Sequence, residues 1–120
     1  MSMLRIAVPN KGKLSESAVD LLKEAGYKCS RNGRELMVSD PDNQIEFVFL
    51  RPRDIAVYVD NGIIELGITG RDLVLDSRAD VSEVMALNFG RSSFCYAVPN
   101  TSDLTPDKFD GLRIATSYPN

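Results

Sequence analysis

The first two thirds of the chain alternate short apolar runs with amphipathic stretches, a pattern typical of strands that are each followed by a helix. The apolar run 4–8 predicts a buried strand closed by Pro9. Apolar residues then recur at helical spacing, which predicts a helix with Ser15 as its N-cap and Gly26 as its stop. The face that this helix would bury consists of Leu14, Ala18, Leu21, Leu22 and Ala25.

The next segment has the signature of a hairpin. Two β-rich runs, 35–39 and 45–50, flank the turn-forming residues 40–43, and we expect the second run to be an interior strand. Pro52 then suits the first position of a helix, because its fixed φ angle and missing N–H are tolerated there. The residues that this helix would bury are Ile55, Tyr58 and Val59.

A third strand is expected at 64–69, and residues 70–72 then open a short helix that ends near Ser77. Thr105 and Pro106 predict a brief helical turn, with Thr105 as its cap. Further strands are expected at 81–87, 94–98 and 112–116. The last of these would lack the crossover helix that covers a buried parallel strand, so we expect the chain to be part of a longer one.

Strands that alternate with helices predict an α/β fold with a mostly parallel sheet and helices on both faces. Such sheets bind ligands outside the carboxyl ends of their strands. Three strand-to-helix junctions, at 9–12, 50–52 and 68–71, would meet at that edge. Because the start of a helix presents unpaired backbone N–H groups and glycine allows close approach, these junctions predict binding of an anion, most naturally a phosphate.

Composition narrows the classes of function. A chain of 120 residues that is 43% hydrophobic can bury one core of ordinary domain size. The net charge is −3 and the basic residues are dispersed, which argues against nucleic acid as a partner. No apolar run is long enough to cross a membrane and no secretory leader is evident, so we expect a soluble, cytoplasmic protein.

The reactive residue types exclude several mechanisms. The two cysteines, Cys29 and Cys95, have neither metal-ligand nor redox spacing, and we expect both to be free thiols. The chain contains no histidine, so it cannot supply a histidine general base or a histidine-containing triad. No covalent catalytic residue and no metal ligand can be assigned by spacing, which leaves electrostatic positioning as the natural source of catalysis.

Residues 7–16, 49–59 and 66–72, taken together, resemble the ATP phosphoribosyltransferase family. The resemblance runs in order from about Leu4 to Asn120. It implies a type II periplasmic-binding-protein-like, two-lobed α/β fold. Residues 1–99 would then form the first lobe of the catalytic domain, and residues 100–120 the crossover and the start of the second lobe.

The resemblance also implies an activity. Members of the family transfer phosphoribosyl from phosphoribosyl pyrophosphate to N1 of ATP, with Mg²⁺ as cofactor, and release pyrophosphate in the first step of histidine biosynthesis. It further implies a homo-oligomer of the parent enzyme and feedback inhibition of the long form by histidine. The later phosphate loop of the family is not among these 120 residues, so we do not expect them to catalyse the reaction alone. The alternative is a non-catalytic small-ligand binding domain of the same architecture.

The candidate cationic residues follow the first two strands. Asn10, Lys11 and Gly12 form a loop that would contact phosphate, although Lys11 could also be an ordinary solvated lysine. Arg51 would reach the same edge for bidentate phosphate pairing, with an ion pair to the nearby Asp54 as the structural alternative. Arg53 is a weaker candidate, because a cation in the first turn opposes the helix dipole.

The remaining candidates follow the third strand and the end of the chain. Thr69 and Gly70 suit an anion-binding loop, but an ordinary strand-to-helix turn carries the same residues. Asp72 could contact a ribose hydroxyl or Mg²⁺, or simply complement the helix dipole. Tyr118 could stack on adenine, although packing is the stronger alternative for a single tyrosine at this place.

Overall fold

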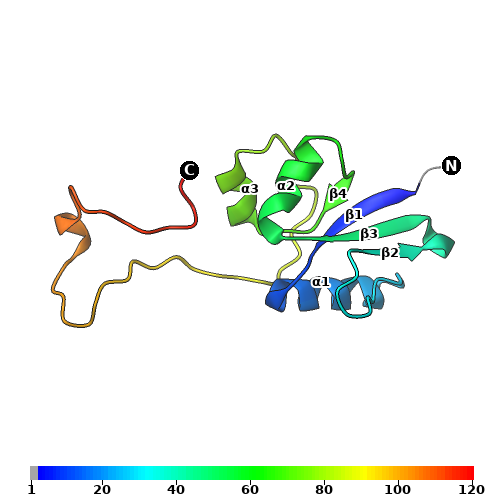
Figure 1. Cartoon of the computed structure of the whole chain (residues 1–120), viewed down its shortest axis with the longest axis horizontal. Coiled ribbons are helices and arrows are strands. Elements are labelled where there is room, and N and C mark those ends of the chain that lie inside the picture. The colour runs from blue at the N-terminus through cyan, green and yellow to red at the C-terminus, as the bar shows by residue number, and fades with distance from the viewer. Residues whose placement is uncertain (1–2) are drawn as a thin grey trace.

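The computed structural model describes residues 3–120, in which four strands and three α-helices occupy the first two thirds of the chain (Figure 1). Their order matches the predicted alternation of strand and helix. In chain order the elements are β1 (Leu4–Pro9), α1 (Gly12–Glu24), β2 (Met37–Asp40), the 3₁₀ turn η1 (Pro41–Asn43), β3 (Ile45–Leu50), α2 (Pro52–Asp60), β4 (Leu66–Gly67), α3 (Arg71–Ser77) and the 3₁₀ turn η2 (Pro106–Lys108).

The four strands form one mixed sheet in the order β2-β3-β1-β4. Strand β1 pairs in parallel with both β3 and β4, while β2 pairs antiparallel with β3. The predicted α/β class, the mostly parallel sheet and the hairpin with an interior second strand are therefore confirmed. The third predicted strand is shorter than expected, since only Leu66 and Gly67 of 64–69 pair with a neighbour.

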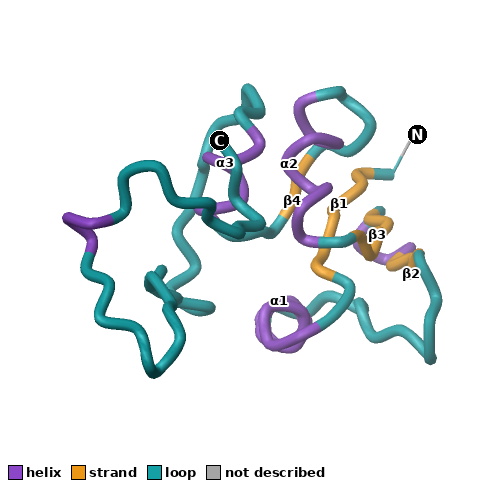
Figure 2. The backbone as a smooth tube through the Cα atoms, turned by 60° about the vertical axis from the view of Figure 1, so that its left-hand side comes forward, coloured by secondary structure: helices purple, strands orange, loops and turns teal. Residues whose placement is uncertain are grey.

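Side-chain alternation along β1 and β3 divides the core between the two faces of the sheet. On one face, Phe47 and Phe49 pack with Ala18 and Leu22 of α1. On the other face, Ala7 packs with Ile55 of α2. Figure 2 shows α1 and α2 on opposite sides of the strands, which is the arrangement that the strand-helix alternation predicts.

Gly67 allows α2 to lie close to the sheet. A Cβ atom at this position would lie 2.4 Å from the Cγ2 atom of Ile55, whose side chain is completely buried. The same Cβ would lie 3.4 Å from Val59 and 3.8 Å from the Cβ atom of Ala7. Close packing of helix on strand therefore requires a residue without a side chain at this place.

Two local predictions about the helices have different outcomes. Gly26 follows the last residues of α1 with a φ of +98° and its N–H bonds to the carbonyl of Lys23, as expected of a helix stop. Ser15 is not the N-cap of α1. The helix begins at Gly12 with Lys11 in the capping position, and Ser15 is buried inside the first turns. The helix starts earlier because Gly12 adopts a φ of +80° and turns the chain directly out of β1.

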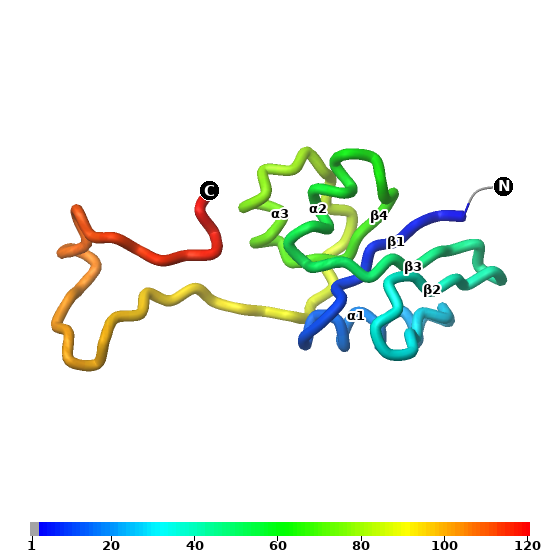
Figure 3. Tube along the Cα trace, viewed as in Figure 1, coloured from blue at the N-terminus to red at the C-terminus, as the bar shows by residue number. Residues whose placement is uncertain are grey.

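The strands predicted at 81–87, 94–98 and 112–116 are wrong. The chain after α3 runs as an irregular path whose only regular element is η2, with Thr105 in the predicted capping position (Figure 3). A strand requires a hydrogen-bonding neighbour, and these three segments pair with no other strand among residues 3–120. Their apolar side chains are correspondingly exposed, with Val84, Phe94 and Ile114 all above 60%.

Both cysteines are free thiols, as expected, with Cys29 buried in the core and Cys95 exposed. Burial raises the pKa of the Cys29 thiol above its ordinary value, which keeps that thiol protonated. In the part of the chain that the structure describes, every helix is too short or too polar to traverse a lipid bilayer.

Candidate functional site

Three loops meet at the carboxyl edge of the sheet, because β1, β3 and β4 run in the same direction. Backbone hydrogen bonds tie the loops to one another. The N–H of Asn10 donates to the carbonyl of Leu50 at 2.9 Å, and the N–H of Ile68 donates to that of Ala7 at 3.0 Å. The Thr69 hydroxyl donates to the carbonyl of Pro52 at 3.0 Å. The three predicted junctions therefore form one continuous rim.

The loop after β1 leaves the positive end of α1 uncompensated. Helix α1 has no side-chain cap and no acidic residue in its first turn. Its first backbone N–H groups are therefore available, and the partial positive charge of the helix start adds to that of Lys11, which is exposed. Apart from its chain neighbours and the backbone of its own helix, no residue among 3–120 has a heavy atom within 4 Å of the position that a Cβ of Gly12 would take, so the backbone here is open to approach.

Asn10 is the more enclosed member of this loop. Its side-chain Oδ1 atom is buried and has no hydrogen-bond partner among the described residues. Its backbone carbonyl accepts a hydrogen bond from Arg31, whose guanidinium carbon lies 4.4 Å from the centre of the Phe49 ring. Arg31 was not predicted from the sequence, because nothing in its local pattern indicates that it returns to the end of β1.

Arg51 occupies the N-cap position of α2 and forms the ion pair that was its structural alternative. Its Nε atom lies 2.8 Å from Oδ2 of Asp54, one turn along the helix. The hydrogen bond to Asp54 and the charge of that carboxylate raise the pKa of the guanidinium, which is therefore fully charged. The Arg51 side chain is 71% exposed, so the ion pair leaves most of it accessible at the rim.

The loop after β4 brings together four of the predicted residues. The Asp72 carboxylate folds back over Gly70, where a Cβ would lie 2.4 Å from Oδ1 of Asp72. The Tyr118 hydroxyl donates a hydrogen bond of 2.9 Å to Oδ2 of the same carboxylate. That hydrogen bond, together with partial burial, raises the pKa of the Tyr118 phenol, so the group is a neutral donor. Thr69 lies next to this group, and its hydroxyl donates its hydrogen bond to the backbone of α2.

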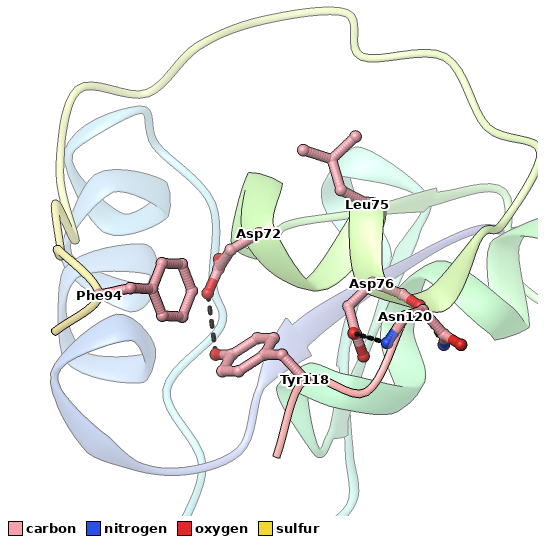
Figure 4. A pocket seen from close by; sticks show the side chains of 6 residues that line it. All are labelled: Asp72, Leu75, Asp76, Phe94, Tyr118 and Asn120. Carbon is pink, nitrogen blue, oxygen red and sulfur yellow. Dashed lines mark hydrogen bonds between the residues drawn. The ribbon is translucent and has the colours of Figure 1, made fainter. Parts of the chain in front are cut away.

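A cavity of about 260 Å³ lies beside this group (Figure 4). The Phe94 and Tyr118 rings meet edge to face, with centroids 4.9 Å apart. The guanidinium carbon of Arg53 lies 5.3 Å from the centre of the Tyr118 ring, close enough for a cation–π contact. The residues that line the cavity are Asp72, Leu75, Asp76, Phe94, Tyr118 and Asn120.

Asp76, Phe94 and Asn120 were not predicted as site residues. The sequence could have indicated Asp76 as a site residue, because it lies four positions after the candidate Asp72 and therefore on the same side of α3. No sequence signal places Phe94 or Asn120 there. Arg53, the weaker candidate in the sequence, pairs with Asp76 at 3.3 Å and is thus integrated into this group.

The described residues do not form a resident metal site. Residues 3–120 contain no cluster of three or more histidine, cysteine, aspartate or glutamate side chains suited to hold a metal ion. Asp72 accepts the hydrogen bond from Tyr118, and both side-chain oxygens of Asp76 accept hydrogen bonds from Arg53 and Asn120. The carboxylates of Asp72 and Asp76 therefore accept hydrogen bonds from other residues of the chain.

The chain is similar to known proteins of one family. The profile of the HisG family, ATP phosphoribosyltransferase, matches residues 51–120. The ATP phosphoribosyltransferase of Salinibacter ruber is 64% identical over 117 residues, which are 97% of this chain and 41% of that protein. The ATP phosphoribosyltransferase of Rhodococcus jostii is 61% identical over 118 residues, or 98% of this chain and 42% of that protein. The chain thus spans about two fifths of the length of the curated relatives that it matches.

A solved structure is similar in fold over part of its length. The ATP phosphoribosyl transferase (HisG:HisZ) complex from Thermotoga maritima matches with a TM-score of 0.58 and 28% sequence identity. The match covers 69% of this chain and 39% of the other.

Proposed function

Because the chain belongs to the ATP phosphoribosyltransferase family, we propose that it carries part of the active site of an enzyme that makes phosphoribosyl-ATP. N1 of the ATP adenine forms a bond to C1 of the ribose of phosphoribosyl pyrophosphate, and the bond from C1 to pyrophosphate breaks. This is the first step of histidine biosynthesis. The observation that carries the proposal is the rim of three loops at the carboxyl edge of the sheet, which gathers backbone donors and cationic side chains.

The charges at the rim suit this reaction. As pyrophosphate leaves, negative charge grows on its oxygens while the sugar acquires oxocarbenium character. One edge of the sheet carries three sources of positive charge, which are the Lys11 ammonium, the N-terminus of α1 and the Arg51 guanidinium. We propose that Asn10, Lys11, Gly12 and Arg51 hold phosphate groups of the substrates. The displacement requires no covalent nucleophile and no histidine, a residue type that the sequence lacks.

The group around Tyr118 has a different chemistry, and we propose that it receives the nucleoside part of ATP. The Tyr118 and Phe94 rings and the Arg53 guanidinium offer apolar and cationic surfaces beside a cavity. The Asp72 carboxylate can accept hydrogen bonds from a ribose hydroxyl or an amino group, and Thr69 and Gly70 support its position. The phosphates of ATP would then point along the rim toward the loop after β1.

Magnesium is proposed to enter with the phosphates of the substrates. A magnesium ion bound in this way takes most of its ligands from phosphate and water and few from protein.

We extend the proposal to the architecture of the enzyme. Residues 1–99 would belong to the first lobe of a periplasmic-binding-protein-like catalytic domain, and residues 100–120 to the crossover and the start of the second lobe. The exposed apolar side chains between 84 and 114 support this, because such side chains normally pack against a partner. We also propose a homo-oligomer, feedback inhibition by histidine in a long form, and a cytoplasmic location that suits the two free thiols.

The rival function is a non-catalytic binding domain with the same architecture, since a fold does not by itself define an activity. The decisive experiment uses the protein that carries this sequence, with calorimetry for ATP and for phosphoribosyl pyrophosphate and an assay of phosphoribosyl-ATP formation with Mg²⁺. Binding of both substrates and formation of product support the transferase. Binding of an amino acid or an oxyanion, with neither substrate bound, would support the rival function instead.

A further inference from the structure

The last residues of the chain lie along one side of α3 and contact two of its carboxylates (Figure 4). The Tyr118 hydroxyl donates to Asp72, and the backbone N–H of Asn120 donates to Oδ1 of Asp76 at 3.1 Å. The Asn120 side-chain amide adds a hydrogen bond of 2.7 Å to the backbone carbonyl of Asp76. We call this set of contacts the α3 ladder. It joins residues that are 44 and 46 positions apart in the sequence.

The spacing of the two partners explains why both contacts form at once. Asp72 and Asp76 lie on the same side of α3, about 6 Å apart along the helix axis. The hydroxyl at the end of the Tyr118 side chain reaches Asp72, and the backbone N–H of Asn120, two residues later, reaches Asp76. The α3 ladder therefore holds this segment against α3 at two points, so that the position of Asn120 constrains where the Tyr118 ring lies.

Asp76 is the fixed end of the ladder. Only 8% of its surface is exposed, and a buried carboxylate needs donors to offset the loss of solvation. Those donors are Arg53, with Nη1 3.3 Å from Oδ2, and the backbone of Asn120. Arg53 also faces the Tyr118 ring. Asp76 therefore holds both Arg53, which contacts the ring, and Asn120, which lies two positions after Tyr118.

We infer that Asp76 is a positioning residue for nucleotide binding, which acts by holding Arg53 and Asn120 and thereby orients the Tyr118 ring. The inference rests on the proposed function, in which Tyr118 contacts the nucleoside part of ATP. Asp76 differs from Asp72 in this role. Both Asp76 oxygens are engaged by the chain itself, whereas Asp72 accepts one hydrogen bond from the residue that is to be positioned.

The first test asks whether Asp76 orients the ring, and it needs no nucleotide. In NMR spectra, ring-to-ring nuclear Overhauser contacts should connect Tyr118 with Phe94, and Tyr27 with Phe47, whose rings also meet edge to face. We expect Asp76→Ala to abolish the first contact and retain the second, which reports on the core. Asp76→Asn serves if the alanine variant fails to fold. The matched control is Asp80→Ala, at an exposed carboxylate beyond the end of α3.

The second test is a double-mutant cycle on ATP affinity, measured by calorimetry in the protein that carries this sequence. Asp76→Ala should weaken ATP binding at least fivefold in the wild-type background and less than twofold when Tyr118→Leu is already present. Asp80→Ala should change neither value. An equal loss in both backgrounds would overturn the inference, because Asp76 would then act without Tyr118.

The two levels of the proposal fail in different ways. Suppose that the wild-type protein binds ATP and that Asp76→Ala keeps both the ATP affinity and the Tyr118–Phe94 contact. That result overturns the positioning role of Asp76 alone. Wild-type protein that does not bind ATP overturns the proposed function, and the role of Asp76 in nucleotide binding falls with it.

Discussion

Replacing Gly67 by alanine adds one methyl group at the tightest contact between α2 and the sheet. The new Cβ would lie 2.4 Å from Cγ2 of Ile55, well inside the distance at which carbon atoms touch. Ile55 is completely buried and belongs to the core cluster on this face, so it has no empty space to enter. The substitution should therefore push α2 away from β4 or force Ile55 into a strained rotamer.

The expected size of the effect follows from two opposing contributions. Overpacking of a well-filled core costs about 1–3 kcal/mol of unfolding free energy. Replacing glycine by alanine also restricts the unfolded chain, which raises the unfolding free energy by about 0.4–1 kcal/mol. The balance is a net loss of about 1–2 kcal/mol. Because each kcal/mol corresponds to about 4 °C in a chain of 120 residues, the melting temperature should fall by about 4–8 °C.

Gly70→Ala is a matched control for Gly67→Ala. A Cβ at Gly70 would also lie 2.4 Å from its nearest neighbour, but that neighbour is the end of the flexible, half-buried Asp72 side chain. The backbone at Gly70, with φ −80° and ψ 141°, is accessible to alanine. Asp72 can rotate away, so we expect a loss of about 1 kcal/mol or less. Thermal and urea unfolding of both variants measure the difference.

Ile55→Leu tests the assigned cause, because leucine keeps the volume and lacks the Cγ2 methyl. Combined with Gly67→Ala, it should recover at least about 0.5 kcal/mol relative to the sum of the single changes. Equal losses for Gly67→Ala and Gly70→Ala, or a strictly additive double variant, would refute the packing argument.

Three further predictions concern the core, the hairpin and the rim. Phe47→Ala should cost about 3–5 kcal/mol in urea unfolding, because Phe47 is completely buried against α1, and a loss below 1 kcal/mol would contradict this. Hydrogen bonds from the Asn43 side chain and the Lys28 backbone lower the pKa of Asp40, so its stabilisation is present above the ordinary aspartate pKa and is lost as pH falls through the lowered value. Asp40→Asn should remove that part of the acid dependence in unfolding curves between pH 7 and pH 3, and an unchanged dependence would exclude Asp40 as its source. Arg51→Ala should slow phosphoribosyl-ATP formation roughly 30-fold, because it removes positive charge from the rim, whereas Arg5→Ala at the amino end of β1 should not, and equal rates in the two variants would remove Arg51 from the site.

The loops of the candidate site were the most predictable part of this protein. Pro52 and Gly70 mark the starts of α2 and α3, and each of these helices begins at or next to the residue that predicted it, whereas α1 begins at Gly12, ahead of the predicted cap Ser15. These signals are local, because they depend on the φ angles that glycine and proline allow and on the spacing of apolar residues. The parallel direction of β1, β3 and β4 then followed from the alternation of strand and helix.

The group around Tyr118 was only partly predictable. Asp72 and Tyr118 were both candidates, yet nothing in the sequence indicated that they share a hydrogen bond. The partners Asp76 and Asn120 were missed, because their contact spans 44 positions along the chain. The sequence likewise could not show that Thr69 donates its hydroxyl to the backbone of α2 instead of presenting it to a ligand.

By itself, the sequence determined the strand-turn-helix units, the apolar faces and the family resemblance, because each of these is written in residues that are close together or in a fixed order. Only the tertiary structure decided that residues 81–116 form no strands and that the chain end returns to α3. The physical reason is that an apolar run becomes a strand only when another strand supplies hydrogen bonds, and distant side chains meet only where packing brings their backbones together.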